Sequence, residues 1–81
     1  MRIKVFVTPR QGILDPQGRA VEAALANLGF TGVSDVHLGR YIVLALDASS
    51  KAVAEETVHK MCEQLLANPM IEDYRFEVEP G

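Results

Sequence analysis

In the stretch Arg2-Ile3-Lys4-Val5-Phe6-Val7-Thr8, every second side chain is a branched aliphatic one. Successive side chains of a β-strand point to opposite faces of a sheet, so this alternation predicts a strand with one buried face. Phe6 departs from the pattern, because it adds an aromatic ring to the polar side. The strand is therefore expected to bury Ile3, Val5 and Val7 and to carry one aromatic ring on its outer face.

Two other stretches predict helices. Asp15-Pro16 opens the first, because aspartate is a favoured N-cap and proline is tolerated at the first helical position. This helix is expected to end at Gly29, since glycine readily takes the positive φ of a helix end. Ser49-Ser50 cap the second helix, and Asn68-Pro69 stop it. The apolar stripes expected to be buried are Val21, Ala24, Leu25 and Leu28 in the first helix, and Ala54, Val58, Met61, Cys62 and Leu65 in the second.

The segment between the helices predicts a β-hairpin. Residues 33–38 and 41–47 would be its strands, and Gly39-Arg40 its two-residue type II′ turn, with glycine supplying the positive φ. In this register Leu38 lies opposite Tyr41. Both faces of the hairpin are then largely apolar, and only one can be covered by the chain's own helices. A partner chain would have to cover the other.

A last strand is expected around Tyr74, Phe76 and Val78, which gives the order βαββαβ in one domain, residues 1–81. The predicted fold class is α+β: an antiparallel sheet with both helices packed on one face and the other face used for oligomerisation. A domain of this size buries only about 60% of the surface of its unfolded chain. Cys62 is the single cysteine, so no internal disulfide stabilises the domain, which again favours oligomerisation.

Composition excludes several classes of partner. A formal net charge of -3 argues against binding to nucleic acids and anionic membranes. No apolar run approaches the roughly 20 residues of a transmembrane helix, and strand-like alternation follows Met1 directly, without a signal-peptide pattern. With a lone cysteine, these features predict a cytoplasmic protein.

No combination of side chains predicts an active site. Each titratable residue has a structural interpretation that needs no catalytic role. Asp15 is expected to cap a helix, Glu72 and Asp73 to lie in an exposed turn, and His59 to face solvent from its helix. His37, beside apolar neighbours, is expected to be packed or at an interface rather than catalytic. Cys62 lies within an apolar stripe, which favours a structural thiol. The two histidines have no neighbouring Cys or His, so no metal site is expected.

Four known kinds of domain share this predicted topology. The loop with Arg10 before the first helix could attract an anion, as in acylphosphatase-like domains, but it holds a single glycine, and Asp15 occupies the cap. Copper chaperones need a Cys-x-x-Cys pair, and RNA-recognition domains need a basic surface. A small-ligand regulatory module of the ACT kind stays open, since its sites form at dimer interfaces without a strong local motif.

Three segments carry a more specific signal: Gly12-Ile13-Leu14-Asp15-Pro16-Gln17-Gly18, Val36-His37-Leu38-Gly39-Arg40, and Met61-Cys62-Glu63-Gln64-Leu65-Leu66-Ala67-Asn68-Pro69-Met70-Ile71-Glu72-Asp73-Tyr74. In content, order and spacing they resemble the PurS family, the small subunit of multi-subunit phosphoribosylformylglycinamidine synthase. His37 departs from the basic residue expected in the family's turn, which puts an anionic contact there in doubt.

The resemblance implies the fourth step of purine synthesis. Formylglycinamide ribonucleotide, glutamine and ATP give formylglycinamidine ribonucleotide, glutamate, ADP and phosphate. It implies a synthetase subunit that uses ATP and Mg²⁺, and a glutaminase subunit that releases ammonia from glutamine. This chain would be a non-catalytic bridge between them, without a cofactor of its own, and would also associate with itself as a dimer or tetramer.

The residues expected to contact partners or to shape the contact surfaces are Asp15, Pro16, Gln17, Gly18, Gly39, Arg40, Asn68, Pro69, Glu72 and Tyr74. A role as caps and turns alone stays open for Gly39, Asn68 and Pro69. For Gln17, Arg40 and Glu72 the sequence shows no local structural need, which favours surface recognition.

Overall fold

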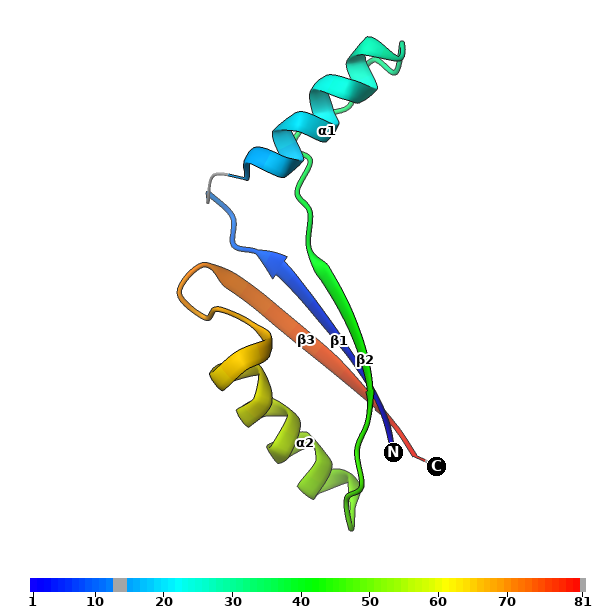
Figure 1. Ribbon diagram of the computed structural model, residues 1–81, viewed down its shortest axis with the longest axis vertical. Coiled ribbons are helices and arrows are strands. Elements are labelled where there is room, and N and C mark those ends of the chain that lie inside the picture. The colour runs from blue at the N-terminus through cyan, green and yellow to red at the C-terminus, as the bar shows by residue number, and fades with distance from the viewer. Residues whose placement is uncertain (13–14, 81) are drawn as a thin grey trace.

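The computed structural model describes residues 1–12 and 15–80; Ile13 and Leu14 of the first quoted motif lie outside the described residues, as does Gly81. The elements follow in the order β1 (Arg2–Pro9), α1 (Pro16–Asn27), β2 (Arg40–Ala45), α2 (Lys51–Met61), a π-helical turn (Cys62–Leu66) and β3 (Glu72–Glu79). Figure 1 shows the sheet with α2 beside it and α1 projecting from one end. The molecule is accordingly long and narrow, 50 × 26 × 15 Å.

The sheet has the order β2-β1-β3, and both pairings are antiparallel. Val5 in the central strand lies opposite Ile42 on one side and Phe76 on the other. This register places Ile3, Val5 and Val7 of β1 on the same face as apolar residues of both neighbouring strands, and this face is called the inner face. Ile3, Val5 and Val7 are fully buried there, as predicted. The predicted α+β class with an antiparallel sheet is thereby confirmed.

The helix α2 covers the inner face. It begins as predicted at Ser50, whose Oγ accepts a hydrogen bond from the Val53 N–H at 3.2 Å. Ala54, Val58 and Cys62 are fully buried against the sheet. The helix lies toward β3, while β2 forms the opposite edge of the sheet (Figure 1). The inner-face side chains of β2, Ile42 and Leu44, are therefore only half-buried.

The predicted hairpin of residues 33–38 and 41–47 is wrong. Residues 33–38 form no strand, and β2 pairs with β1 instead, with Tyr41 opposite Phe6. This pairing puts Ile42 and Leu44 on the same face as Ile3 and Val5, which a local hairpin would not do. Gly39 is accordingly not a turn residue with positive φ. A Cβ atom at Gly39 would lie 2.2 Å from the Val7 carbonyl oxygen, so glycine is required for the close approach to β1.

The prediction that both helices pack on one face is wrong for α1. This helix extends beyond the end of the sheet, beside the returning segment 30–38 (Figure 1), and α1 with this segment is called the arm. Leu28, from the stripe expected to be buried, is 74% exposed. The helix end itself is as predicted: Gly29 has φ +95°, and the Phe30 N–H donates to the Leu25 carbonyl at 3.0 Å. Within the arm, Asp15 joins α1 to the returning segment, as described below.

At the end of α2, the leucine that faces the core is not the one that the sequence predicted. The Ala67 N–H donates to the carbonyl of Cys62, five residues earlier, at 3.1 Å, which is the hydrogen bond of a π turn. The extra residue rotates the following side chains, so Leu65 is 83% exposed and Leu66 packs against the core in its place. Neither α1 nor α2 has the length and apolar character needed to cross a membrane, as far as the described residues go.

The rotation at the π turn is tested by truncating each leucine. We expect Leu66→Ala to lower the free energy of unfolding by about 2 kcal/mol, because it removes a side chain packed on the core. Leu65→Ala is expected to change it by less than about 0.5 kcal/mol, since this side chain is exposed. Urea unfolding followed by circular dichroism measures both. A larger loss for Leu65→Ala would show that the helix ends in the predicted α register.

Candidate functional site

The carboxylate of Asp15 joins the two sides of the arm. Its Oδ1 accepts a hydrogen bond from the Gly18 N–H at 2.9 Å, the predicted N-cap contact. Its Oδ2 accepts from the Leu38 N–H at 2.8 Å. These two backbone donors, Gly18 first and Leu38 second, lower the pKa of Asp15 below its usual value. The charged form therefore holds the start of α1 against the segment that returns to the sheet.

Gly18 makes this close packing possible. A Cβ atom at this position would lie 2.0 Å from the carbonyl oxygen of Val36, so any side chain would push the returning segment away. Gly18 thus permits a close approach of two segments within the chain. Pro16 and Gln17, the neighbouring residues of the quoted motif, are exposed in the first turn of α1.

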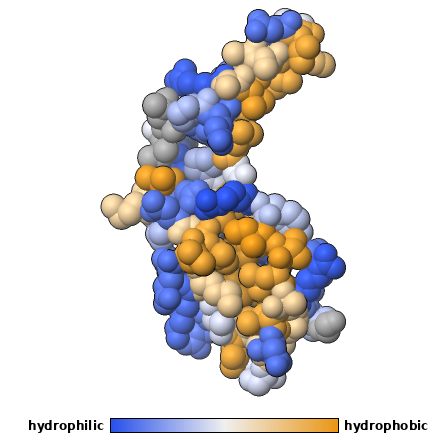
Figure 2. Space-filling model, in the orientation of Figure 1, coloured by the Kyte–Doolittle hydropathy of each residue, from blue (hydrophilic) through white to orange (hydrophobic). Residues whose placement is uncertain are grey.

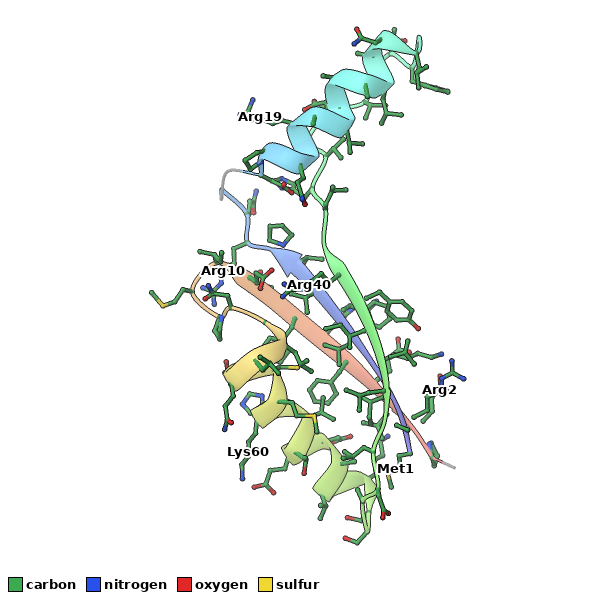
Figure 3. The ribbon with its side chains drawn as sticks, viewed as in Figure 1. Met1, Arg2, Arg10, Arg19, Arg40 and Lys60 are labelled. Carbon is green, nitrogen blue, oxygen red and sulfur yellow. The ribbon has the colours of Figure 1, made fainter. Side chains whose placement is uncertain are left out.

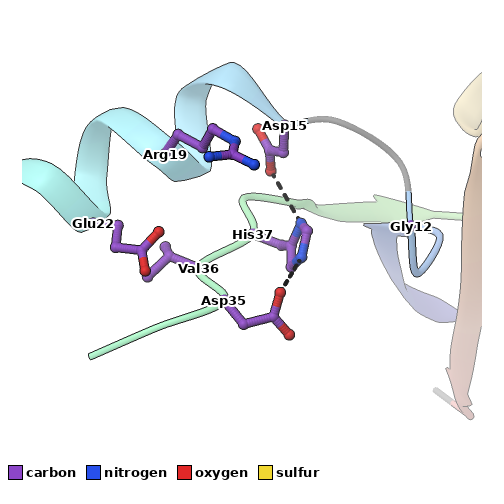
Figure 4. Close-up of a pocket in the computed structure, with 7 residues that line it drawn as sticks. All are labelled: Gly12, Asp15, Arg19, Glu22, Asp35, Val36 and His37. Atoms are coloured by element: carbon purple, nitrogen blue, oxygen red, sulfur yellow. Dashed lines mark hydrogen bonds and ion pairs between the residues drawn. The ribbon is translucent and has the colours of Figure 1, made fainter. Parts of the chain in front are cut away.

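An open polar pocket of about 410 Å³ lies between α1 and the returning segment, shown in Figure 4. His37 stands between two carboxylates, with its Nε2 2.9 Å from Asp35 Oδ1 and its Nδ1 3.7 Å from Asp15 Oδ2. Asp35 has φ 57°, in the left-handed region. His37 was expected to be packed among apolar neighbours or to lie at an interface, and the structure places it in this polar pocket. The residues that line the pocket are Gly12, Asp15, Arg19, Glu22, Asp35, Val36 and His37.

A second polar group, the exit cluster, consists of Arg40, Leu66, Asn68 and Glu72. Arg40 Nη2 donates to the Leu66 carbonyl at 2.8 Å and to Glu72 Oε1 at 3.0 Å. Glu72 Oε1 also accepts from the Asn68 N–H at 2.7 Å. The starts of β2 and β3 are thereby tied to the point where the chain leaves the π turn. Arg40 and Glu72 have a structural role, which the sequence had not revealed.

Asn68 and Pro69 form a tight turn next to the exit cluster. The Asn68 carbonyl accepts from the N–H groups of Ile71 at 3.0 Å and Glu72 at 2.7 Å, and its side-chain oxygen accepts from Met70 at 3.1 Å. Arg10 approaches from the end of β1, with its Nε 3.5 Å from Asp73 Oδ1. Figure 3 shows Arg10 and Arg40 at the same end of the sheet. The turn role left open for Asn68 is thus present in the structure.

Tyr74 lies apart from both groups. Its hydroxyl is 2.8 Å from Nδ1 of His59, which connects β3 to α2. Burial, followed by the nearby charge of Glu63, raises the pKa of Tyr74 above its usual value. The sequence had predicted that His59 simply faces water. Only the fold, which sets α2 over β3, reveals this link.

The outer face of the sheet carries an aromatic patch that no helix of this chain covers in the described structure. The rings of Phe6 and Tyr41 are stacked, with centroids 4.9 Å apart, and the Arg75 guanidinium lies 3.9 Å from the Phe6 centroid. Val43, on the same face, is 45% exposed. Phe6, noted in the sequence for its outward position, is thus the centre of a stacked group.

Two kinds of reactive group can be assessed directly, a metal ion and the thiol of Cys62. The described part of the chain contains no group of three or more Asp, Glu, His or Cys side chains arranged for a metal ion. Cys62 is fully buried, and burial raises its pKa, which disfavours the reactive thiolate. The chemistry that the arrangement offers is hydrogen bonding, charge and apolar contact.

Gly18 gives a direct test of how the arm is held. Within an ordinary helix, replacing glycine by alanine stabilises by about 1 kcal/mol. Gly18→Ala is expected to destabilise instead, because the new Cβ meets the Val36 carbonyl. The new side chain should push the returning segment away from α1. The Leu38 amide, which donates to Asp15, should then exchange its hydrogen faster. Gln17→Ala, at the exposed neighbouring position, is the control and should leave this exchange unchanged. Unaltered exchange in Gly18→Ala would contradict the close packing.

Comparison with known proteins places the chain in a family. The PurS family model, described as phosphoribosylformylglycinamidine (FGAM) synthase, matches residues 2–80. The PurS subunit of phosphoribosylformylglycinamidine synthase from Bacillus subtilis is 45% identical over 78 residues, covering 96% of this chain and 92% of that protein. The corresponding subunit from Synechocystis is 48% identical over 75 residues, covering 93% of this chain and 75% of that protein.

Solved structures agree with this assignment. A C2 crystal form of B. subtilis PurS has a TM-score of 0.87 and 44% identity, with 98% of each chain covered. A chain in the structure of PurLQS from Thermotoga maritima has a TM-score of 0.84 and 34% identity, with 94% of this chain and 93% of that chain covered. The match extends over the sheet, both helices and the three quoted motifs, and the chain belongs to the PurS family.

Proposed function

We propose that this chain is the small subunit of phosphoribosylformylglycinamidine synthase in purine biosynthesis, where it bridges the synthetase and glutaminase subunits in the cytoplasm. The observation that carries this proposal is the family match over residues 2–80, together with the likeness to a chain of PurLQS. The ACT-like alternative has no comparable support, because every relative and structure described above is a PurS or a complex that contains one.

The proposed role is positional. Ammonia released in one subunit and used in another would equilibrate with solvent unless the two subunits were held together. A tether raises the effective concentration of one subunit at the other, to the millimolar range for a short connection. ATP, Mg²⁺ and glutamine are then used by the partners, and this chain supplies contact surfaces. Its long shape and projecting arm suit contact with more than one partner.

Self-association completes the proposal. The space-filling view in Figure 2 shows apolar residues gathered over the region around α2 and along the arm. Leu28 on the arm, Tyr41 and Val43 on the outer sheet face, and the half-covered β2 edge all leave apolar surface in contact with water. A chain of this size has a small core, which contributes little stability to offset the cost of exposing apolar side chains to water. Covering these surfaces with a second copy of the chain would therefore be strongly favourable.

The role of the outer sheet face is tested with two matched valines. Val43 on this face and Val53 on the outer side of α2 are each 45% exposed. We expect Val43→Glu to shift the parent oligomer toward monomer, because a carboxylate would be buried in the contact. The sheet should tolerate it, since Val43 lies directly opposite Lys4. Val53→Glu should keep the parent mass. Analytical ultracentrifugation at micromolar concentration measures both, and an unchanged mass for Val43→Glu would exclude this face as the contact.

The bridging role is tested by reconstitution. Synthetase and glutaminase are assayed with and without this chain, using either glutamine or a high ammonium concentration as nitrogen source. We expect omission to slow the glutamine-dependent reaction about tenfold or more, because the tether is lost, and to leave the ammonium-dependent reaction unchanged. Equal slowing of both would indicate a direct effect on the synthetase. No slowing of either would show that the chain is not a subunit of this enzyme.

A further inference from the structure

The π turn at the end of α2 determines which of two adjacent leucines faces the core. In an α-helix, residues seven apart lie on nearly the same face, about two turns from one another. Leu65 follows the fully buried Val58 by seven residues and would therefore be buried if the α geometry continued. The hydrogen bond from Ala67 to Cys62 inserts one residue, and Leu66, which is partly buried, packs against the core in place of Leu65.

Each register directs one leucine toward the core and leaves the other outside, so the two registers offer the core a side chain of the same size. Ordinary helix geometry favours the α form, since π turns are rare and occur mostly as single insertions inside α-helices. Packing alone therefore gives no reason for the π form. A polar interaction at the end of the helix has to favour it.

The exit cluster provides that interaction. The Leu66 carbonyl is one of the last carbonyls of the helix, which have no partner within it, and Arg40 Nη2 donates to this oxygen at 2.8 Å. The same nitrogen is 3.0 Å from Glu72 Oε1, which also accepts from the Asn68 N–H at 2.7 Å. Two positions of the chain, Leu66 and Asn68, are thus tied to one ion pair between the first residues of β2 and β3.

We infer that the Arg40–Glu72 pair selects the π register and thereby keeps Leu65 on the surface. The pair joins the first residues of β2 and β3, and it determines how the side chains of the last helical turn are rotated about the helix axis. Without it, the last turn returns to the α form, Leu65 turns inward, and Leu66 turns outward. This inference concerns the isolated chain and does not depend on the proposed function.

The inference is tested by the reactivity of introduced thiols. Leu65→Cys and Leu66→Cys are made in the parent chain and in an Arg40→Met chain, where methionine keeps an unbranched apolar stem but removes the donors. The rate of reaction with a maleimide is measured for each. Cys62 is fully buried, so its own rate, measured in each background without the added cysteine, is a small correction.

In the parent chain we expect the thiol at 65 to react at least about tenfold faster than the thiol at 66, in line with their exposures. In Arg40→Met this ratio should fall toward or below one. Arg75→Met is the matched control, because Arg75 pairs with Glu77 on the outer face and does not touch the exit cluster. An unchanged ratio in a folded Arg40→Met chain would overturn the inference.

A second measurement reads the hydrogen bond itself. Scalar couplings across hydrogen bonds in NMR identify the carbonyl that accepts from the Ala67 N–H. We expect Cys62 in the parent chain and Glu63 when the pair is broken. If Arg40→Met does not fold, Glu72→Gln replaces it in both measurements, since glutamine keeps an acceptor for Asn68 but removes the charge that holds Arg40. A coupling to Cys62 that persists in Glu72→Gln, with an unchanged thiol ratio, would overturn the inference.

Discussion

The rest of the structure depends on β1, which is hydrogen-bonded along both edges. Its register with β2 and β3 places Ile3, Val5 and Val7 at the centre of the inner face, and every other buried side chain packs around them. Because both neighbours run antiparallel to β1, they start at the same end of the sheet. Arg40 and Glu72, the first residues of β2 and β3, are therefore close enough to pair despite a sequence separation of 32.

The placement of α1 is the chain's largest departure from a self-sufficient domain. A small α+β domain would usually cover its sheet with both helices. Here a single helix covers it, toward β3, while α1 lies beyond the sheet with Leu28 in water. This arrangement gives up burial within the chain and offers apolar surface at two separate places, the arm and the outer sheet face. Exposed apolar surface of this kind favours association, which agrees with the family's place in a multi-subunit enzyme.

Local features of the fold could be predicted from the sequence, and features set by distant residues could not. The alternation of β1 and the caps at Asp15, Gly29 and Ser50 depend on neighbouring residues, and all were predicted correctly. The alternation of residues 41–47 fits any antiparallel partner, so it could not show that this partner is β1 rather than residues 33–38. Leu65 was misplaced because the π turn is tied to Arg40, far away in the sequence. For the same reason Arg40 and Glu72 had looked like free surface residues.

Three consecutive residues determine how the arm meets the sheet. Leu38 donates its N–H to Asp15 at the start of α1, Gly39 packs against the Val7 carbonyl of β1, and Arg40 binds the end of the α2 helix. The first contact lies within the arm, and the other two join the returning segment to β1 and to the π turn. The motif from Val36 to Arg40 therefore contains the contacts through which the returning segment of the arm meets the rest of the chain.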